Sequence, residues 1–490
     1  MKQNHINTAS DYTTSDPVKT STKWFFAMGD IFQGGFFNIV NFFYGIFLTD
    51  VMGISPFWAG VVFLIGRVFD AVTDPAMGVI SDNTRTRFGR RRPYFLIGTP
   101  FILIMFIAMW YPVNVDSDSV RVIYFIVAYM LMNTASTIIS IPFLAMTAEL
   151  STDYNERTSI TNIRIIVSIT SSLICAVVPM LLVSAVQDIH TGYILMSVVF
   201  GLFFALPMLL VFFKVPERKQ FSQGEKSSWK EMFATLRIKV FRRFILMYLC
   251  IVVAMDTTAM IFAYYMTYNL GRSDELSFVL GTLLISQVAL VPLASKFIAA
   301  TSKNVGIVVG NVGWIICAAL SFFIGPDSPG FLIYLLAGAL GGFMGFSVIG
   351  FTSIFGDMTE VGEYHFGHRV EGSFSGIQQF VRKCAAAIAN WAALTLLGIV
   401  GFINPVEIVE NGVTIIQVQE QTSVVLYTIR GILGMTSILL LIPSTIIAIR
   451  WKLTKSKHAA LGNYLDRKRA GLEIDEKEEQ SVAEICKPLI

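Results

Sequence analysis

Long apolar stretches set the strongest limit on what this chain can fold into. A helix that spans a bilayer needs about 20 mostly apolar residues, and windows of that size give twelve candidates along the 490 residues. The candidates run over 24–49, 56–81, 93–111, 120–148, 158–184, 192–213, 243–270, 274–299, 305–324, 330–356, 373–401 and 424–450. The sequence therefore predicts an all-α membrane protein with twelve transmembrane helices in two pseudo-symmetric six-helix bundles.

Composition supports this interpretation and excludes other classes of protein. Only 14% of the residues are charged and 54% are hydrophobic, whereas a soluble chain carries about a quarter charged residues. The five cysteines are scattered singly, without the spacing of a zinc site or a disulfide framework. The chain has no recognisable nucleophile arrangement, metal cluster or nucleotide loop, so we expect neither an enzyme nor a cofactor. We expect a monomer in a lipid bilayer and no nucleic-acid partner.

The positions of Lys and Arg predict how the chain is oriented in the membrane. Most of the 37 lie in the tails, the middle loop and alternate short loops, while Arg121, Arg272 and Arg430 lie near the opposite face. Positive charge in short loops stays on the cytoplasmic side. Both termini are therefore expected in the cytoplasm, at the cytoplasmic (inner) membrane. The first helix follows a polar tail of about 23 residues, which does not fit a cleaved signal.

The same segmentation predicts how the chain is divided. An acidic helix end followed by a charged loop recurs near 148–157 and 356–372, as expected for a duplicated six-helix unit. The predicted parts are a cytoplasmic N-terminal tail (1–23), an N-terminal bundle (24–213), a cytoplasmic linker (214–242), a C-terminal bundle (243–450) and a cytoplasmic C-terminal tail (451–490).

Charged residues inside the second predicted helix carry the clearest functional signal. Asp70 and Asp74 are four residues apart, so they lie on one face of the helix, with Arg67 and Thr73 beside them. Carboxylate and hydroxyl oxygens are ligands that hard cations prefer, and two adjacent carboxylates can also share a proton. The alternative is a salt bridge from Arg67 that locks the helix to a neighbour without any ion. Because one Arg does not easily neutralise two buried acids, we favour a cation or proton site.

The loop that follows reads GVISDNTRTRFGRRRP over 78–93. Asp82 can accept hydrogen bonds from Arg side chains, and Arg87, Arg90 and Arg91 are expected at the cytoplasmic surface. One hypothesis is a gating loop that holds the two bundles together in one state of a transport cycle. The other is a topology signal that also contacts anionic lipid. Five Arg exceed what orientation needs, so we expect both roles.

These residues, with three shorter motifs, carry a resemblance. The stretch from Asp70 to Leu96, Ile141-Pro142-Phe143, the loop 153–157 and GEYHFGHRVEG over 362–372 resemble the glycoside-pentoside-hexuronide:cation symporters of the major facilitator superfamily. The resemblance implies the major facilitator fold and alternating access to a substrate between the two bundles. It also implies that Asp70, Thr73, Asp74 and Thr137 hold the coupling Na⁺, Li⁺ or H⁺. With sodium, Asp70 and Asp74 would be the metal ligands.

Several polar and aromatic side chains in the predicted helices could meet a hydroxylated ligand. They are Gln33, Asn38, Asn41, Asn133, Ser140, Asp256, Tyr264, Gln378, Gln379 and Trp391. Each has an alternative role in a helix-to-helix hydrogen bond or as an interfacial aromatic. Asp256 stands out because it lies deep in its helix without a local base. At the positions where the family recognises galactosides this chain has Gly35, Ser140 and Leu144, so a galactoside is not expected.

Two basic residues fall where the family lines its central cavity. Arg164 and Lys383 could bind the carboxylate of an acidic glycoside, or they could pair with Asp30, Glu149 or Asp70. The sequence thus predicts cation-coupled symport, with Na⁺ or H⁺, of a sugar, glycoside or short oligosaccharide, a hexuronide-type substrate being one option. The alternatives are a symporter of lysolipids or other amphiphiles on the same fold and a nontransporting membrane sugar sensor.

Overall fold

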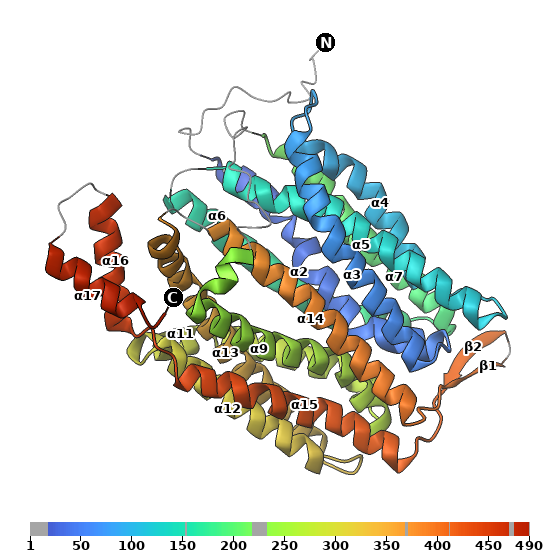
Figure 1. Cartoon of the computed structure of the whole chain (residues 1–490). Helices are drawn as coiled ribbons and strands as arrows, with labels where there is room; N and C mark the ends of the chain where they lie inside the picture. The colour runs from blue at the N-terminus through green and yellow to red at the C-terminus, as the bar shows by residue number, and fades with distance from the viewer. Residues whose placement is uncertain are drawn as a thin grey trace. The chain divides into compact units, whose positions relative to one another are not determined.

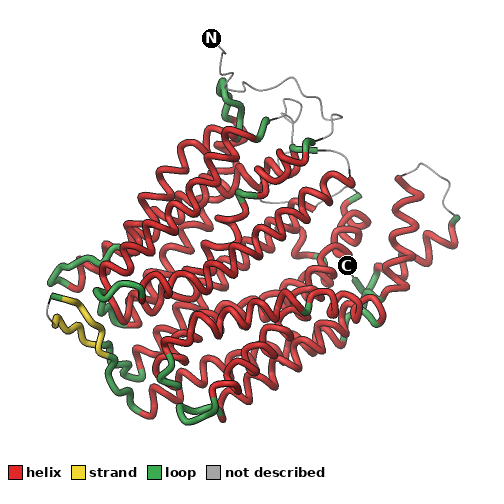
Figure 2. The backbone as a smooth tube through the Cα atoms, turned by 180° about the vertical axis from the view of Figure 1, so that it is seen from behind, coloured by secondary structure: helices red, strands yellow, loops and turns green. Residues whose placement is uncertain are grey.

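The computed structural model describes residues 18–151, 154–217, 233–367, 371–410, 412–469 and 475–489. Helices form almost all of this part of the chain, and one pair of short strands is present (Figure 2). Most of the predicted N-terminal tail and linker, together with Asp153 and His368, lie outside the described residues. An almost wholly helical chain agrees with the fold class predicted from its apolar stretches.

Eleven helical segments among the described residues are long and apolar enough to cross a membrane. They are Pro56–Asn83, Arg92–Trp110, Asp118–Thr147, Glu156–Ser184, Ile189–Lys214, Lys239–Asn269, Ser273–Ala300, Lys303–Phe323, Gly330–Phe366, Ser373–Ile399 and Ser423–Ile449. Most begin and end within a few residues of the predicted bounds. The second to twelfth predicted helices are therefore present as long apolar helices.

The predicted first helix, 24–49, has a less regular form. A turn at Met28 and Gly29 separates two α-helices, and π-helical turns follow. The pieces are α1 (Thr20–Ala27), α2 (Asp30–Ile39), η1 (Val40–Tyr44) and η2 (Phe47–Val51). None of them alone reaches the length of a membrane span, which is why the described residues show eleven continuous spans rather than twelve. π-Helical turns of this kind are frequent at functional sites.

Contacts along the backbone divide the chain into two compact units. Unit 1 comprises Met1–Gly224, Ala259–Gly281 and Ala387–Ile429, and unit 2 comprises Glu225–Thr258, Thr282–Ala386 and Arg430–Ile490. Four helices contribute residues to both units: α9 (Lys239–Tyr264), α10 (Leu276–Ala289), α14 (Glu371–Ile399) and α15 (Ser423–Ile449). The bundle boundaries predicted from composition are a different division of the chain and stay a prediction.

Unit 1 contains the helices of the N-terminal half. They are α1, α2, α3 (Pro56–Asn83), α4 (Arg92–Trp110), α5 (Asp118–Glu149), α6 (Tyr154–Ser184) and α7 (Ile189–Lys214). Helix α3 packs against α5, α4 packs against α5 and α7, and α2 packs against α6, as the blue-to-green helices of Figure 1 show. α3 begins with Pro56, whose missing N–H costs nothing at the first helical position.

Aromatic rings fill the core of unit 1. Tyr44 stacks on Tyr129 with ring centroids 5.4 Å apart and meets Trp110 edge-on at 5.2 Å. Phe47 packs against Trp110 and Tyr193 at 5.2 and 4.8 Å. All five side chains are at most 2% exposed. This cluster holds α4, α5 and α7 around the irregular first helix.

Unit 1 also carries a β-hairpin that the apolar pattern did not predict. Strands β1 (Val406–Glu410) and β2 (Val413–Gln417) pair antiparallel within the predicted outward joint between the last two helices. The Asp188 carboxylate accepts hydrogen bonds from Thr191 at the start of α7 and from the Thr414 backbone N–H, 3.0 Å away. The hydroxyl and the backbone N–H of Thr191 hold the pKa of Asp188 well below its usual range. Asp188 thus caps α7 and ties the hairpin to it.

Unit 2 is built around a long glycine-rich helix. This helix is α13 (Gly330–Phe366), and α11 (Val291–Ala300) and α12 (Lys303–Leu320) pack against it. The prediction that this helix ends at 356, with His365 in a loop, is wrong. The helix continues through His365 and ends at Gly367, whose φ of 76° forms a left-handed C-cap. The charged residues after 356 hid this extension from a search for apolar windows.

Two helices of the C-terminal tail dock on the end of α13. They are α16 (Lys455–Arg469) and α17 (Glu476–Cys486). His458 Nε2 lies 3.3 Å from an Asp357 oxygen and 3.0 Å from a Glu360 oxygen, and Lys303 Nζ lies 2.6 Å from Asp357. The apolar side of the tail is buried: Leu461, Tyr464, Leu465, Val482, Cys486 and Leu489. The tail is therefore a folded part of unit 2.

Close packing of α13 against α10 generates a stability prediction. A Cβ on Gly341 would lie 2.0 Å from the Leu283 carbonyl oxygen, whereas a Cβ on Gly356 of the same helix would meet nothing within 4 Å. Overpacking of this kind costs about 1–3 kcal/mol. We expect Gly341→Ala to lower the melting temperature in detergent and Gly356→Ala, the control on the same helix, not to lower it. Equal melting temperatures for the two variants would contradict the packing.

Candidate cation site and predicted gating loop

Two carboxylates converge on one hydroxyl in unit 1. The Thr137 hydroxyl oxygen on α5 lies 2.8 Å from an oxygen of Asp70 and 2.8 Å from an oxygen of Asp74, both on α3. Asp70 and Thr137 are 2% and 3% exposed. The spacing of four residues that placed both acids on one face of α3 therefore turns that face toward α5. Three of the four predicted ligands, Asp70, Asp74 and Thr137, thus meet at one point.

The hydrogen count at Thr137 shows what this arrangement can do. A hydroxyl carries a single hydrogen, so Thr137 donates to only one of the two carboxylates at a time. The other contact brings two acceptors together unless a proton or a cation lies between them. Thr73, also a predicted ligand, donates to the Asp70 backbone carbonyl at 3.2 Å, and its lone pairs remain available. Pro75 lies inside α3 and leaves the Ala71 carbonyl without its helical donor.

Arg67, which the alternative prediction paired with the acids, is buried beside them. Its guanidinium lies over the Phe37 ring, 4.7 Å from the centroid, and it interacts electrostatically with Tyr129. The side chain is 6% exposed. The cation-π contact with α2 and the interaction with α5 place the positive charge between three helices. One Arg and two acids leave this region with a formal charge of −1.

The polar residues predicted on the first helix lie in unit 1 with partners of several kinds. Gln33 donates to the Ser140 hydroxyl at 2.8 Å, which joins α2 to α5. Asn38 donates to the Gly34 carbonyl of its own helix at 3.1 Å, and Asn41 is buried in η1. Helix-to-helix bonding was the alternative role for such residues, and Gln33 and Ser140 show it. A role in substrate binding stays a prediction for all of them.

Arg164 pairs with Asp30, one of the three acids that the sequence left open as partners. Its guanidinium donates two hydrogen bonds of 2.6 and 2.9 Å to the Asp30 carboxylate and one of 2.8 Å to the Thr147 hydroxyl. It also lies over the rings of Phe143 and Phe26, at 4.9 and 5.5 Å. Asp30 is 5% exposed. The bidentate pair joins α2 to α6 and already occupies the group that could have bound a substrate carboxylate.

Tyr264 and Trp391, predicted as sugar contacts, lie among other residues of unit 1. The Tyr264 hydroxyl is 2.9 Å from the Thr49 hydroxyl, and the Tyr264 ring is fully buried. Trp391 lies against α3 at Gly60, where a Cβ would come within 3.0 Å of the Trp391 carbonyl oxygen. Asp50, next to Thr49, accepts a hydrogen bond of 2.8 Å from the Tyr268 hydroxyl. Sequence reasoning did not single out Asp50 or Tyr268.

In unit 2, Asp256 has the charged neighbour that its own helix does not supply. The expectation of no local base holds along α9, but Arg382 on α14 interacts electrostatically with Asp256 and reaches the Tyr248 hydroxyl. Asp256 and Tyr248 are 8% and 3% exposed, whereas Arg382 is exposed. Gln379 is exposed and Lys383 is half-buried, on the same helix. Arg382 lies within the predicted helix 373–401, and only the fold reveals its partner.

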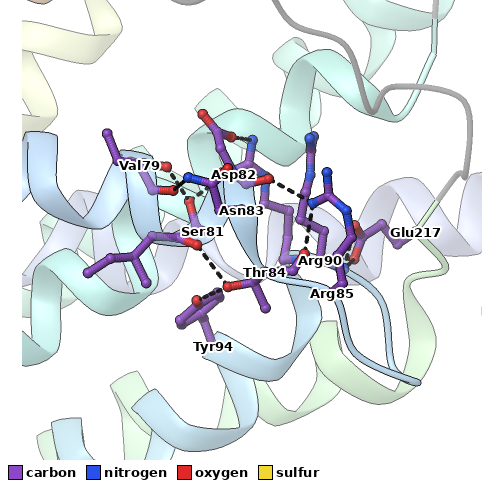
Figure 3. A network of polar contacts seen from close by, with 12 residues as sticks. Val79, Ser81, Asp82, Asn83, Thr84, Arg85, Arg90, Tyr94 and Glu217 are labelled. Atoms are coloured by element: carbon purple, nitrogen blue, oxygen red, sulfur yellow. Dashed lines mark hydrogen bonds and ion pairs between the residues drawn. The ribbon is translucent and has the colours of Figure 1, made fainter.

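The predicted gating loop is a compact network at one end of unit 1 (Figure 3). Arg91, 5% exposed, donates to Ser81 at 2.6 Å and forms an ion pair with Asp82, so it ties α4 back to the end of α3. The Arg90 backbone N–H bonds to Glu217, and its side chain is half-buried. Arg87 is exposed and lies over the Phe88 ring at 4.6 Å. The four predicted residues thus belong to one loop but have different surroundings.

Glu217, a residue that the sequence did not single out, organises this loop. Its carboxylate accepts the backbone N–H groups of Arg90 and Arg91 at 2.8–2.9 Å, at the start of α4, where the helix dipole favours a negative charge. A Cβ on Gly89 would lie 2.3 Å from a Glu217 oxygen, and Gly89 has a φ of 112°. Only glycine fits there. Arg92 donates to the Phe212 carbonyl at 3.1 and 2.6 Å and completes the junction with α7.

Comparison with known proteins shows the family of the chain. The family described as MFS/sugar transport protein matches residues 25–444. The chain is 27% identical to the uncharacterized symporter YjmB of Bacillus subtilis, over 96% of this chain and all of that one. It is 26% identical to the isoprimeverose transporter of Lactiplantibacillus pentosus, over 82% of this chain and 86% of that protein.

The chain is also similar to a relative named for a different substrate and to a solved structure. The chain is 24% identical to the sodium-dependent lysophosphatidylcholine symporter 1-B of Danio rerio, over 59% of this chain and 61% of that one. The crystal structure of the nucleoside transporter NupG superposes with a TM-score of 0.56 at 12% identity, over 87% of this chain and 98% of that one, which shows the transporter fold alone. The chain therefore belongs to the MFS/sugar transport protein family, as its resemblance to the glycoside-pentoside-hexuronide:cation symporters predicts.

Proposed function

We propose that the protein is a secondary active transporter that couples the downhill entry of a monovalent cation to the uptake of a sugar or glycoside. The observation that carries the proposal is the convergence of Asp70 and Asp74 on the Thr137 hydroxyl. It offers several hard oxygen ligands in a region whose formal charge of −1 one Na⁺ or H⁺ would neutralise. Relatives named as symporters and as an isoprimeverose transporter support the same class of activity.

The energetic cost of the site explains why it would bind a cation before the bundles move. An uncompensated charge at the centre of the bilayer costs a few kcal/mol or more. Cation binding removes the net charge of the site and fixes α3 against α5. Coupling then requires that cation and sugar each favour the other's binding, an effect that is reciprocal by thermodynamic necessity. In this proposal the protein acts as a monomer by alternating access, in the cytoplasmic membrane with both termini in the cytoplasm.

In unit 1 the contacts favour a neutral sugar as the substrate. Arg164 is already paired with Asp30, and its guanidinium is the group there that could otherwise have bound a substrate carboxylate. Lys383 keeps an acidic, hexuronide-type glycoside as the second candidate. The relative named as a lysophosphatidylcholine symporter favours a third, an amphiphile. Purified protein in proteoliposomes, given a panel of neutral sugars, uronides and lysolipids under imposed Na⁺ or H⁺ gradients, separates the three. Binding of a sugar without gradient-driven accumulation would instead identify a nontransporting sensor.

Removal of one negative charge tests the cation site. We expect Asp70→Asn to abolish uptake driven by a cation gradient, since the amide keeps an oxygen but loses the charge that binds the ion. Thr137→Val should weaken uptake as well, because it removes the shared hydroxyl. The controls are Asp118→Asn, whose carboxylate is 89% exposed, and Thr134→Val, whose hydroxyl bonds within its own helix. Normal sodium- or proton-driven accumulation by Asp70→Asn would refute the proposal.

Charge removal on α14 tests the nature of the cargo. If the substrate carries a carboxylate that binds Lys383, Lys383→Ala should lower uptake of acidic glycosides by about tenfold, the cost of one charge-assisted hydrogen bond. Neutral glycosides should lose much less and serve as the internal control. Uptake of each class is measured as initial rate against substrate concentration. An equal loss for both classes would count against carboxylate recognition by Lys383.

A further inference from the structure

The cation site continues along α3 and α5 as a ladder of facing residues. Gly66, Asp70 and Asp74 recur every four residues on one face of α3, and Tyr129, Asn133 and Thr137 recur every four residues on the facing side of α5. A Cβ on Gly66 would lie 2.2 Å from the Tyr129 ring and 3.0 Å from the Asn133 amide nitrogen. The ladder thus places Asn133 one turn, and Tyr129 two turns, before the hydroxyl that joins the two acids.

The polar atoms of these two residues are buried without well-formed hydrogen bonds among the described residues. Tyr129 and Asn133 are 0% exposed. The Tyr129 hydroxyl lies near the Asn133 amide and the Arg67 guanidinium, yet the hydroxyl, both polar atoms of Asn133 and the Arg67 Nε all lack a partner in hydrogen-bond geometry. Buried polar groups are normally hydrogen-bonded, so several unsatisfied groups at one place point to a ligand such as ordered water.

Charge connects this polar layer to the carboxylates. Tyr129 interacts electrostatically with both Arg67 and Asp70, and Arg67 lies three residues before Asp70 on α3. The Tyr129 hydroxyl, the Asn133 amide and the Arg67 guanidinium are all hydrogen-bond donors. Water held by these groups would add an oxygen ligand beside Asp70, which a metal cation needs and a proton does not. The layer therefore has the chemistry to influence which cation the acids accept.

We propose that Tyr129, Asn133 and Arg67 form a hydrated polar layer that positions Asp70 and selects a metal cation, Na⁺ or Li⁺, over the proton as the coupling ion. The layer acts through ordered water and does not itself ligate the ion. Tyr129 and Asn133 are thus positioning residues. The inference rests on the proposed function, because it requires that Asp70 binds the coupling cation.

The test compares uptake driven by sodium with uptake driven by protons in the same proteoliposomes. We expect Tyr129→Phe and Asn133→Leu each to lower the ratio of sodium-driven to proton-driven uptake by about tenfold, since loss of a group behind a metal ligand typically weakens metal binding by that factor or more. The sodium concentration for half-maximal uptake should rise to the same extent, and in Tyr129→Phe the maximal rate at saturating sodium should stay near that of the wild type. Asn133→Gln, which keeps the amide, should recover part of the ratio.

Two controls separate this role from a purely structural one. Tyr193→Phe removes a hydroxyl from another buried ring of the same core, which stacks on Trp110 at 6.0 Å, and should leave the ratio unchanged. Melting temperatures should not fall in Tyr129→Phe or Asn133→Leu, because each removes a polar group that makes no well-formed hydrogen bond to the protein. A structural role would lower the melting temperature without changing ion preference.

Failure of this inference can be told apart from failure of the proposed function. If Asp70→Asn abolishes coupling while Tyr129→Phe and Asn133→Leu keep the wild-type ratio, the polar layer has no part in selection and the inference is overturned. A wild-type protein driven by protons alone would overturn it too. If Asp70→Asn couples normally, the proposed function itself is refuted.

Discussion

The free energy of charge in an apolar span is the constraint on which this structure depends. Asp70, Asp74 and Arg67 lie within a helix long and apolar enough to cross a membrane, where each isolated charge is costly. The fold meets the cost by turning the acids toward one hydroxyl of a neighbouring helix and by laying the guanidinium over an aromatic ring. Charged side chains thus occur within this helix where groups on neighbouring helices stabilise them.

Two other charges within the helices follow the same rule with different partners. Arg164 closes on Asp30 with two hydrogen bonds and joins two helices of unit 1. Arg382 on α14 interacts electrostatically with the buried Asp256 in unit 2. The side chains of Arg164 and Asp30 are mostly buried, whereas Arg382 is exposed. Pairs that hold helices together are thus distinct from the two acids of α3, whose negative charges exceed the positive charge beside them.

Local sequence patterns predicted the parts of the fold that local physics decides. Apolar length located most spans, and the period of the helix placed Asp70 and Asp74 on one face. Contacts between residues far apart in the sequence could not be predicted. Glu217 binds backbone N–H groups 125–127 residues away, and the sequence does not distinguish it from other acids as the partner of that loop. The hairpin 406–417 and the extension of α13 to Phe366 were missed because both are too polar for an apolar window. The polar layer at Tyr129 and Asn133 requires knowing which face of α5 meets α3.

The length of α13 has a mechanical consequence. At 1.5 Å per residue its 37 residues extend about 55 Å, while the hydrocarbon core is about 30 Å thick. Asp357 and Glu360, which bind Lys303 and His458, lie in the last part of this helix, so α16 is attached near its end. If α13 tilts as a rigid rod, α16 would be displaced farther than the part of α13 inside the bilayer, so a label on α16 would report that tilt.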